Sequence, residues 1–164
     1  TGARLGPVRW RFIFLHVGLL VTVASAFWGA PDSLTCRMKA LEGVPSSEAF
    51  MMDGTPVWLK YEIELKDFNM EKYESSVPSD FSAEVLVEGK PVILRVNHPY
   101  SVRYGEQIYL SGYDTAAGEN SGYCILQIVR EPWKYWALAG IIMMLIGAFM
   151  LFVGGPRKRY NDID

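Results

Sequence analysis

The sequence has few histidines and few cysteines, two kinds of side chain that enzymes often use for catalysis. It contains two histidines, His16 and His98, and two cysteines, Cys36 and Cys124, among 164 residues. Two histidines exclude a histidine-rich metal site within this chain, and without a C-x-x-C pair a catalytic dithiol is disfavoured. No serine–histidine–aspartate signature, phosphate-binding glycine loop or recognisable carboxylate pair is present. We therefore expect at most a subunit of an enzyme, with no autonomous catalytic site.

Formal charge is missing from two long apolar stretches, residues 12–28 and 136–153. As α-helices they would be roughly 25 and 27 Å long, and the hydrocarbon core of a bilayer is about 30 Å thick. We predict a membrane protein with two transmembrane α-helices, over residues 12–28 and 132–153. The main alternative for the first stretch is a cleaved signal sequence, because the small residues Ala24, Ser25 and Ala26 lie near its end.

Basic residues flank both apolar stretches on the sides of the chain termini. Those before the first stretch are Arg4, Arg9 and Arg11, and those after the second are Arg157, Lys158 and Arg159. Short basic flanks remain in the cytoplasm, so both tails, residues 1–11 and 154–164, are expected inside and residues 29–131 outside. The outer segment carries sixteen acidic and nine basic residues, which disfavours nucleic acid as a partner.

The pattern between the two apolar stretches is that of β-strands. Residues 57–65, VWLKYEIEL, alternate between apolar and charged side chains, as in a half-buried strand. Further strands are expected at residues 81–87, 92–97, 108–113 and 123–129, and the turn at residues 88–91 predicts a hairpin. Residues 29–55 are expected to form a loop with at most one short helix or strand. Together these segments predict a mostly antiparallel β-domain, either a sandwich or a partial barrel.

The two cysteines fall in the segment that we expect to lie outside the membrane, where disulfides persist. Cys36 follows the first apolar stretch and Cys124 precedes the second. Two alternatives remain open: a structural disulfide that joins the two ends of the domain, or two unpaired thiols.

His16 is the one strongly polar side chain in the first apolar stretch. Polar side chains inside a bilayer are costly and often functional. It lies about 200° around the helix from Gly18, which begins a stripe of small residues with Thr22 and Ala26 that favours close helix packing. His16 either forms a hydrogen bond to a neighbouring helix or headgroup, or binds haem iron as an axial ligand. His98 is expected to be a surface turn residue.

Several short motifs, in order between the two apolar stretches, resemble the ResB family, also called CcsB. Leu65-Lys66-Asp67-Phe68 with Tyr73, then Pro78-Ser79-Asp80-Phe81-Ser82, is similar to one family stretch. Val96-Asn97-His98-Pro99-Tyr100, followed by Gly105-Glu106-Gln107-Ile108-Tyr109 and Ser111-Gly112-Tyr113, is similar to another, although Leu110 replaces a usual glutamine. Arg130-Glu131-Pro132 before an aromatic-rich run resembles the start of the family's last membrane helix.

The resemblance implies a role in cytochrome c biogenesis at the bacterial inner (cytoplasmic) membrane. The family pairs with CcsA, moves haem outward, and the complex attaches haem to C-x-x-C-H motifs of apocytochrome c. His16 matches the histidine of the helix before the outer domain, so the resemblance makes it a candidate axial haem ligand. Full-length members have three helices before that domain and this chain has one, so we expect the C-terminal part of a ResB protein or a reduced relative.

Two other functions remain open at this point. One is a structural accessory subunit of a larger respiratory or electron-transfer complex, without haem chemistry of its own. The other is an extracytoplasmic binding or sensor domain held by two helices, which would need a ligand pocket.

Overall fold

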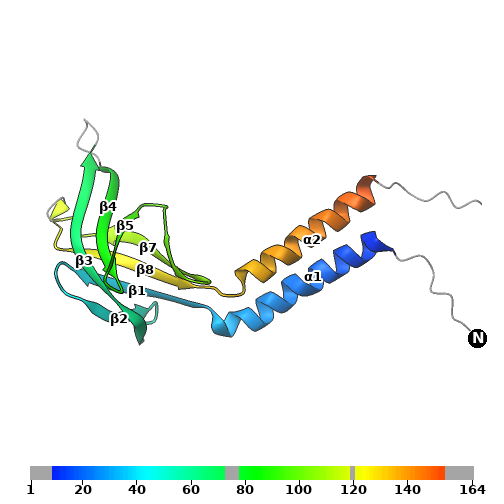
Figure 1. Ribbon diagram of the computed structural model, residues 1–164, viewed down its shortest axis with the longest axis horizontal. Coiled ribbons are helices and arrows are strands. Elements are labelled where there is room, and N and C mark those ends of the chain that lie inside the picture. The colour runs from blue at the N-terminus through cyan, green and yellow to red at the C-terminus, as the bar shows by residue number, and fades with distance from the viewer. Residues whose placement is uncertain (1–8, 73–77, 119–120, 154–164) are drawn as a thin grey trace, which may run out of the picture. The chain divides into compact units, whose positions relative to one another are not determined.

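The computed structural model describes residues 9–72, 78–118 and 121–153, and the chain divides into two compact units (Figure 1). The first is a helical hairpin of α1, Trp10–Gly29, and α2, Lys134–Val153. The second, Asp32–Pro132, is here called the β unit. The predicted combination of two apolar helices and an antiparallel sheet is confirmed.

The β unit contains eight strands after a short 3₁₀ helix, η1, that spans Ala30–Asp32. The strands are β1 Leu34–Leu41, β2 Ser46–Met51, β3 Pro56–Lys72, β4 Pro78–Val87, β5 Lys90–Arg95, β6 Tyr100–Arg103, β7 Glu106–Tyr113 and β8 Tyr123–Arg130. Five of them overlap the strands predicted from the sequence. The family-like Tyr73, residues 1–8 and residues 154–164, with the basic residues at 4 and at 157–159, lie outside the described residues. The predicted tail over residues 1–11 is too long at its end, because α1 begins at Trp10 and includes Arg11.

Glycines let the two helices of the hairpin approach closely. A Cβ atom added at Gly18 would lie 2.7 Å from the carbonyl oxygen of Gly140 and from the amide nitrogen of Met144. One added at Gly147 would lie 2.6 Å from the amide nitrogen of Leu15. Only a hydrogen atom fits at these positions, as is common where helices pack in lipid. Both helices are long and apolar enough to cross a membrane.

The packed face of α1 differs in one residue from the predicted stripe. Gly18, Ser25 and Gly29 are buried and Thr22 is half-buried, but Ala26 is exposed. The residues at positions 18, 22, 25 and 29 are separated by four, three and four residues, and this spacing keeps them on one side of the helix, facing one partner. Residues separated by four each time would move progressively around the helix axis. The hydroxyls of Thr22 and Ser25 donate to the carbonyls of Gly18 and Val21 at 2.9 and 2.7 Å, so neither polar group is left without a partner.

All eight strands form one antiparallel sheet in the order β5-β4-β3-β2-β1-β8-β7-β6. The expected hairpin between β4 and β5 is present. Its two turn residues, Glu88 and Gly89, both have positive φ angles, 52° and 76°, as a type I′ turn requires.

The prediction of a loop over residues 29–55 is wrong, because that segment contains β1 and β2. In β1, Cys36, Met38 and Ala40 are buried, while Arg37 and Lys39 between them are exposed. The alternation is regular, but its inward positions hold no β-branched or aromatic residue, the types that favour strands. The short edge strand β6 was also missed.

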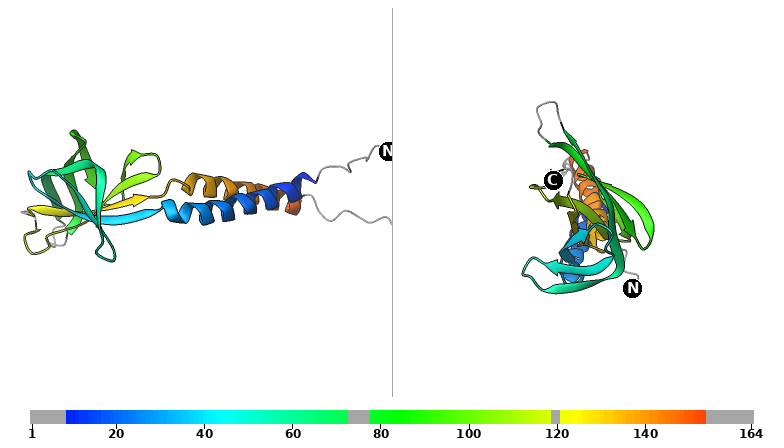
Figure 2. Two further views of the ribbon diagram at one scale, coloured as in Figure 1. Left: turned by 90° about the horizontal axis from the view of Figure 1, so that it is seen from below. Right: turned by 90° about the vertical axis from the view of Figure 1, so that its left-hand side faces the viewer.

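The chain connection between β5 and β6 forces the sheet to curl. These strands are at opposite edges of the sheet, which in a flat sheet would be about 34 Å apart. Only residues 96–99 connect them, and five Cα steps span at most about 18 Å. The sheet therefore wraps around its own core (Figure 2), which includes Met38, Ile63, Leu94 and Leu126 at 0–1% exposure.

Two sets of side chains cross the curled sheet. The hydroxyl of Tyr61 on β3 donates to Oε1 of Glu106 on β7 at 2.6 Å, and burial, followed by the hydrogen bond to Glu106, raises the pKa of Tyr61. The ring of Tyr113 on β7 lies 5.2 Å from that of Phe68 and 5.0 Å from that of Phe81. These contacts join strands that do not pair with one another.

The substitution Gly140→Val tests the close packing of the hairpin. A side chain there would collide with the backbone of Gly18 and Thr22, so we expect a loss of about 1–3 kcal/mol in the stability of the hairpin. Thermal unfolding in detergent, followed by helical circular dichroism, measures the change. Ala139→Val, on the exposed side of α2, is the control; equal losses in both variants would contradict close packing.

The substitution Tyr61→Phe tests the hydrogen bond across the sheet. It leaves the Glu106 carboxylate without its donor, and the free energy of unfolding of the β unit should fall by about 1.5–3 kcal/mol. The urea midpoint of the detergent-solubilised chain, followed by the circular dichroism of the sheet, measures the fall. The control is Tyr109→Phe, whose hydroxyl bonds only Gln107 of its own strand. A control that is as destabilised as Tyr61→Phe would refute the role of the cross-sheet bond.

Candidate functional site

His16 is exposed on α1, and its ring has a defined tautomer. Its Nδ1 atom lies 2.8 Å from the carbonyl oxygen of Phe12, one turn earlier. A carbonyl only accepts hydrogen bonds, so Nδ1 carries the proton and donates it. In the neutral imidazole, the Nε2 atom then keeps its lone pair. This is the form in which imidazole binds a metal ion, with the other ring nitrogen oriented by a backbone carbonyl.

The side chain of Phe12 also restrains the ring of His16. The two ring centroids are 3.7 Å apart and the planes are inclined by 28°, a stacked pair at the four-residue spacing that brings side chains together on a helix. The hydrogen bond satisfies the Nδ1 donor, so a neutral imidazole is tolerated in apolar surroundings. The arrangement thus holds the ring without using Nε2.

The histidine and the glycines lie on different faces of α1. Gly18 is buried against α2, whereas His16 is exposed together with Leu20, Val23 and Phe27. The His16 side chain is therefore not on the face of α1 that packs against α2. The sequence predicts this arrangement of His16 and Gly18 on opposite faces of α1.

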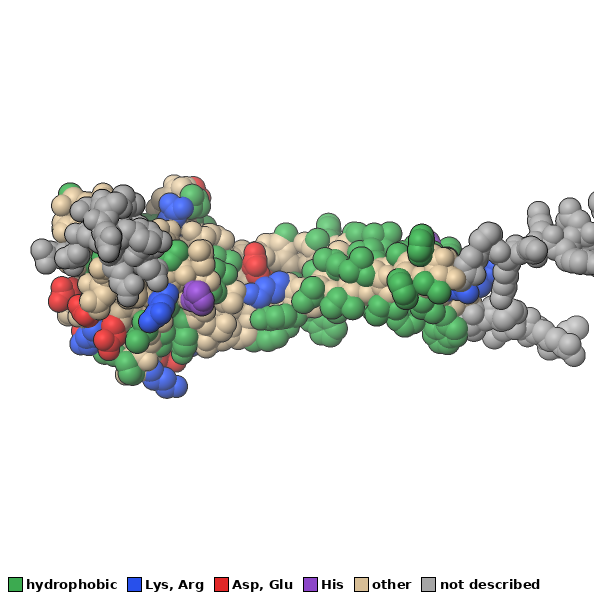
Figure 3. Space-filling model, turned by 90° about the horizontal axis from the view of Figure 1, so that it is seen from above, with side chains coloured by type: hydrophobic (Ala, Val, Ile, Leu, Met, Phe, Trp, Pro, Cys, Tyr) green, Lys and Arg blue, Asp and Glu red, His purple; other side chains and the backbone are tan. Residues whose placement is uncertain are grey.

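Hydrophobic side chains cover much of the visible hairpin surface, and charged side chains gather on the β unit (Figure 3).

The chemistry of His16 suits it to bind haem iron as one axial ligand. A neutral imidazole with a free Nε2 and an anchored Nδ1 matches the donor chemistry of a haem-binding histidine. Among the residues that the structure describes, no three histidine, cysteine, aspartate or glutamate side chains group together as a metal site.

His98 occupies a tight turn after β5. Its amide donates to the carbonyl of Arg95 at 3.1 Å, and its Nδ1 lies 3.0 Å from the carbonyl of Val96. The side chain is exposed. This agrees with the predicted surface turn residue.

Cys36 and Cys124 are both buried and both free. They lie on the paired strands β1 and β8, but Cys36 is opposite Ile128 and Cys124 is opposite Ala40. Four residues along a strand correspond to about 13 Å, and a disulfide needs Cα atoms within about 7 Å. The structure therefore has the second of the two alternatives, unpaired thiols, because the register separates them.

The two thiols are also protected from reaction. Burial raises the pKa of Cys124 to about 12, and burial and then the charge of Glu106 raise the pKa of Cys36. Since the thiolate is the reactive form, we expect both thiols to be unreactive in the folded chain. Their role is to fill the core beside Leu126 and Ile128.

A thiol titration without reductant distinguishes the two alternatives. We expect no reaction with an aromatic disulfide reagent in the folded chain and two thiols per chain after denaturation, because both side chains are buried but unbonded. If the denatured chain gave thiols only after reduction, a disulfide would be present. The variant Cys124→Ala, which should give one thiol, is the control.

Of three comparisons with known proteins, one shows the family of the chain and one shows a similar fold. Among solved structures, the cytochrome c heme lyase CcmF has a similar fold, with a TM-score of 0.55 at 12% sequence identity. The match covers 90% of this chain but only 26% of that one, so this chain spans about a quarter of the CcmF structure. No curated protein was matched by sequence. The model of the ResB-like family matches residues 6–122. Because that match covers most of the sequence, the chain belongs to the ResB-like family.

Proposed function

We propose that this chain is a membrane subunit of the machinery that transfers haem across the membrane and attaches it to apocytochrome c. Membership of the ResB-like family supports a role in cytochrome c biogenesis, and the fold shared with a cytochrome c heme lyase is consistent with it. Haem is then the cargo of the machinery and not a resident cofactor of this chain.

The observation that carries the proposal is the state of His16. Its Nδ1–H group is bonded to the Phe12 carbonyl at 2.8 Å, its ring is stacked on Phe12, and Nε2 is open. In this role Nε2 of His16 binds haem iron as one axial ligand. Phe12 orients the ring, and the exposed side chains around it provide apolar surface for the porphyrin.

The proposed arrangement in the membrane follows from the charges and the helix contacts. The basic residues near both chain ends favour cytoplasmic termini, with the β unit on the periplasmic side of the bacterial inner membrane. His16 is near the N-terminal end of α1 and so near the cytoplasmic face, where haem enters. The glycine contacts of α1 with α2 support a first helix that is retained and not cleaved.

A single ligand on an outward face implies a shared site. The partner would be a multi-helix membrane protein of the CcsA type, which supplies the second axial ligand and covers the haem. The β unit would contact this partner or the apocytochrome on the periplasmic side. The chain would then act as part of a haem lyase without being an enzyme alone.

The substitution His16→Gly tests this function. In the chain purified with its partners, the variant should lose most of the bound haem, seen as a fall in the Soret band, since one of two axial ligands is absent. Added imidazole should restore the band, because a free imidazole replaces the missing donor. This recovery would not occur if the substitution had only disturbed folding.

The control is His98→Gly, which removes the other histidine from an exposed turn. It should leave the haem content and the Soret maximum unchanged. Full haem retention with an unshifted Soret band in His16→Gly would refute ligation by His16. That result, with only respiratory subunits in the purified particle, would instead support the accessory-subunit function.

A further inference from the structure

The turn between β2 and β3 presents large apolar side chains to solvent. Met52 is 70% exposed, Trp58 is 67% exposed and Phe50 is 44% exposed. Phe50 is opposite Pro56, and Glu48 is opposite Trp58. Phe50 and Trp58 are therefore diagonal neighbours on the same, outward face of the ladder. Single exposed apolar residues are ordinary, but a cluster on one turn suggests a contact surface.

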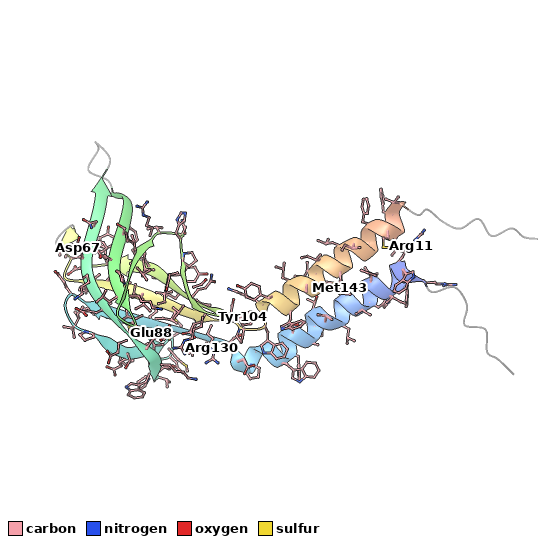
Figure 4. All side chains as sticks on the ribbon, in the orientation of Figure 1. Arg11, Asp67, Glu88, Tyr104, Arg130 and Met143 are labelled. Carbon is pink, nitrogen blue, oxygen red and sulfur yellow. The ribbon has the colours of Figure 1, made fainter. Side chains whose placement is uncertain are left out.

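The register places this turn at the end of the β unit where the chain joins the helices. Met51 is opposite Cys36, near the start of β1, and Leu34 is opposite Arg130, the last residue of β8. Tyr104 and Arg130 lie at this end of the sheet, and Asp67 lies at the other (Figure 4). Both covalent connections to the hairpin leave from the end that carries the apolar turn.

The chain length limits how far this end can be from the bilayer. Helix α1 ends at Gly29 and β1 begins at Leu34, and five Cα steps span at most about 18 Å. The headgroup layer extends about 5–8 Å beyond the hydrocarbon on each side. The connection is therefore short enough to allow a turn beside the first residues of β1 to touch the headgroups when α1 spans the membrane.

The chemistry of the turn suits this layer. Tryptophan and other amphipathic aromatic side chains prefer the membrane interface, and Arg37, opposite Phe50 and exposed, matches lipid phosphates. Asp53 limits how deeply the β2–β3 turn can enter the membrane. Its Oδ1 accepts from the Thr55 amide at 2.9 Å, a bond that lowers its pKa, so the tip stays charged and above the hydrocarbon.

We infer that the β2–β3 turn rests in the phospholipid headgroup layer of the membrane that α1 and α2 cross, through Phe50, Met52 and Trp58. The turn acts as a third attachment of the chain to the membrane. The inference depends on the proposed spanning of the hairpin but not on haem binding by His16.

Three labelled variants of the full chain test the contact. Met52→Cys, Leu20→Cys and Ile93→Cys replace side chains of 70%, 67% and 66% exposure, and each receives an environment-sensitive fluorophore after reconstitution into phosphatidylcholine–phosphatidylglycerol vesicles. Leu20 is on α1. Ile93 is opposite Glu84, which is opposite Asp67 at the far end of the sheet. Cys36 and Cys124 are buried, so the unsubstituted chain provides the labelling blank.

Quenching by lipids brominated near the headgroup gives the readout. We expect a blue-shifted Met52→Cys label that is quenched severalfold more than the Ile93→Cys label, with Leu20→Cys quenched by deeper bromines. If Met52→Cys matched Ile93→Cys while Leu20→Cys was quenched, the inference would be overturned and the spanning hairpin would stand. Failure at Leu20→Cys would overturn both. Protection of Met52→Cys only when partner proteins are added would assign the turn to a protein contact and overturn the lipid contact.

Discussion

The pairing of β1 with β8 is the constraint on which the rest of the structure depends. Eight consecutive pairs, from Leu34 opposite Arg130 to Leu41 opposite Tyr123, join the first and last strands of the β unit in the middle of its sheet. Paired strands are about 4.8 Å apart, so the two connections to the hairpin leave from neighbouring points. Helices that continue from them pack closely, and the glycines at 18, 140 and 147 provide the space.

The close packing of α1 against α2 also determines where on α1 a histidine can lie if it is to bind a ligand. One face of α1 is occupied by α2, and a side chain as large as histidine on that face would meet the backbone of the partner helix, as even a Cβ added at Gly18 would. A histidine used for a ligand has to lie elsewhere on the helix. His16 does, and the carbonyl of Phe12 satisfies its Nδ1 donor without help from α2. The hairpin is therefore complete in itself and still presents a donor atom to its surroundings.

Local patterns allowed part of this structure to be predicted from the sequence. The alternation of β3, the hairpin turn within residues 88–91 and the opposition of His16 to Gly18 depend on residues close in sequence. The β1–β8 pairing, the unpaired state of Cys36 and Cys124 and the Tyr61–Glu106 bond depend on register between distant strands, which no local pattern specifies. The strand β1 was missed because its inward residues are neither β-branched nor aromatic, and it pairs with β2 and β8 on its two sides.

The curled sheet also separates the two roles of its side chains. Inward positions hold side chains such as Met38, Ile63 and Leu94 that are almost completely buried, and the polar pair Tyr61 and Glu106 satisfies itself across the core. These positions serve stability, because any exchange there alters packing at several strands. Recognition is then left to the outward positions and the turns. An outward face tolerates substitution, so three large apolar residues at the β2–β3 turn need a reason beyond folding, and contact with a surface provides one.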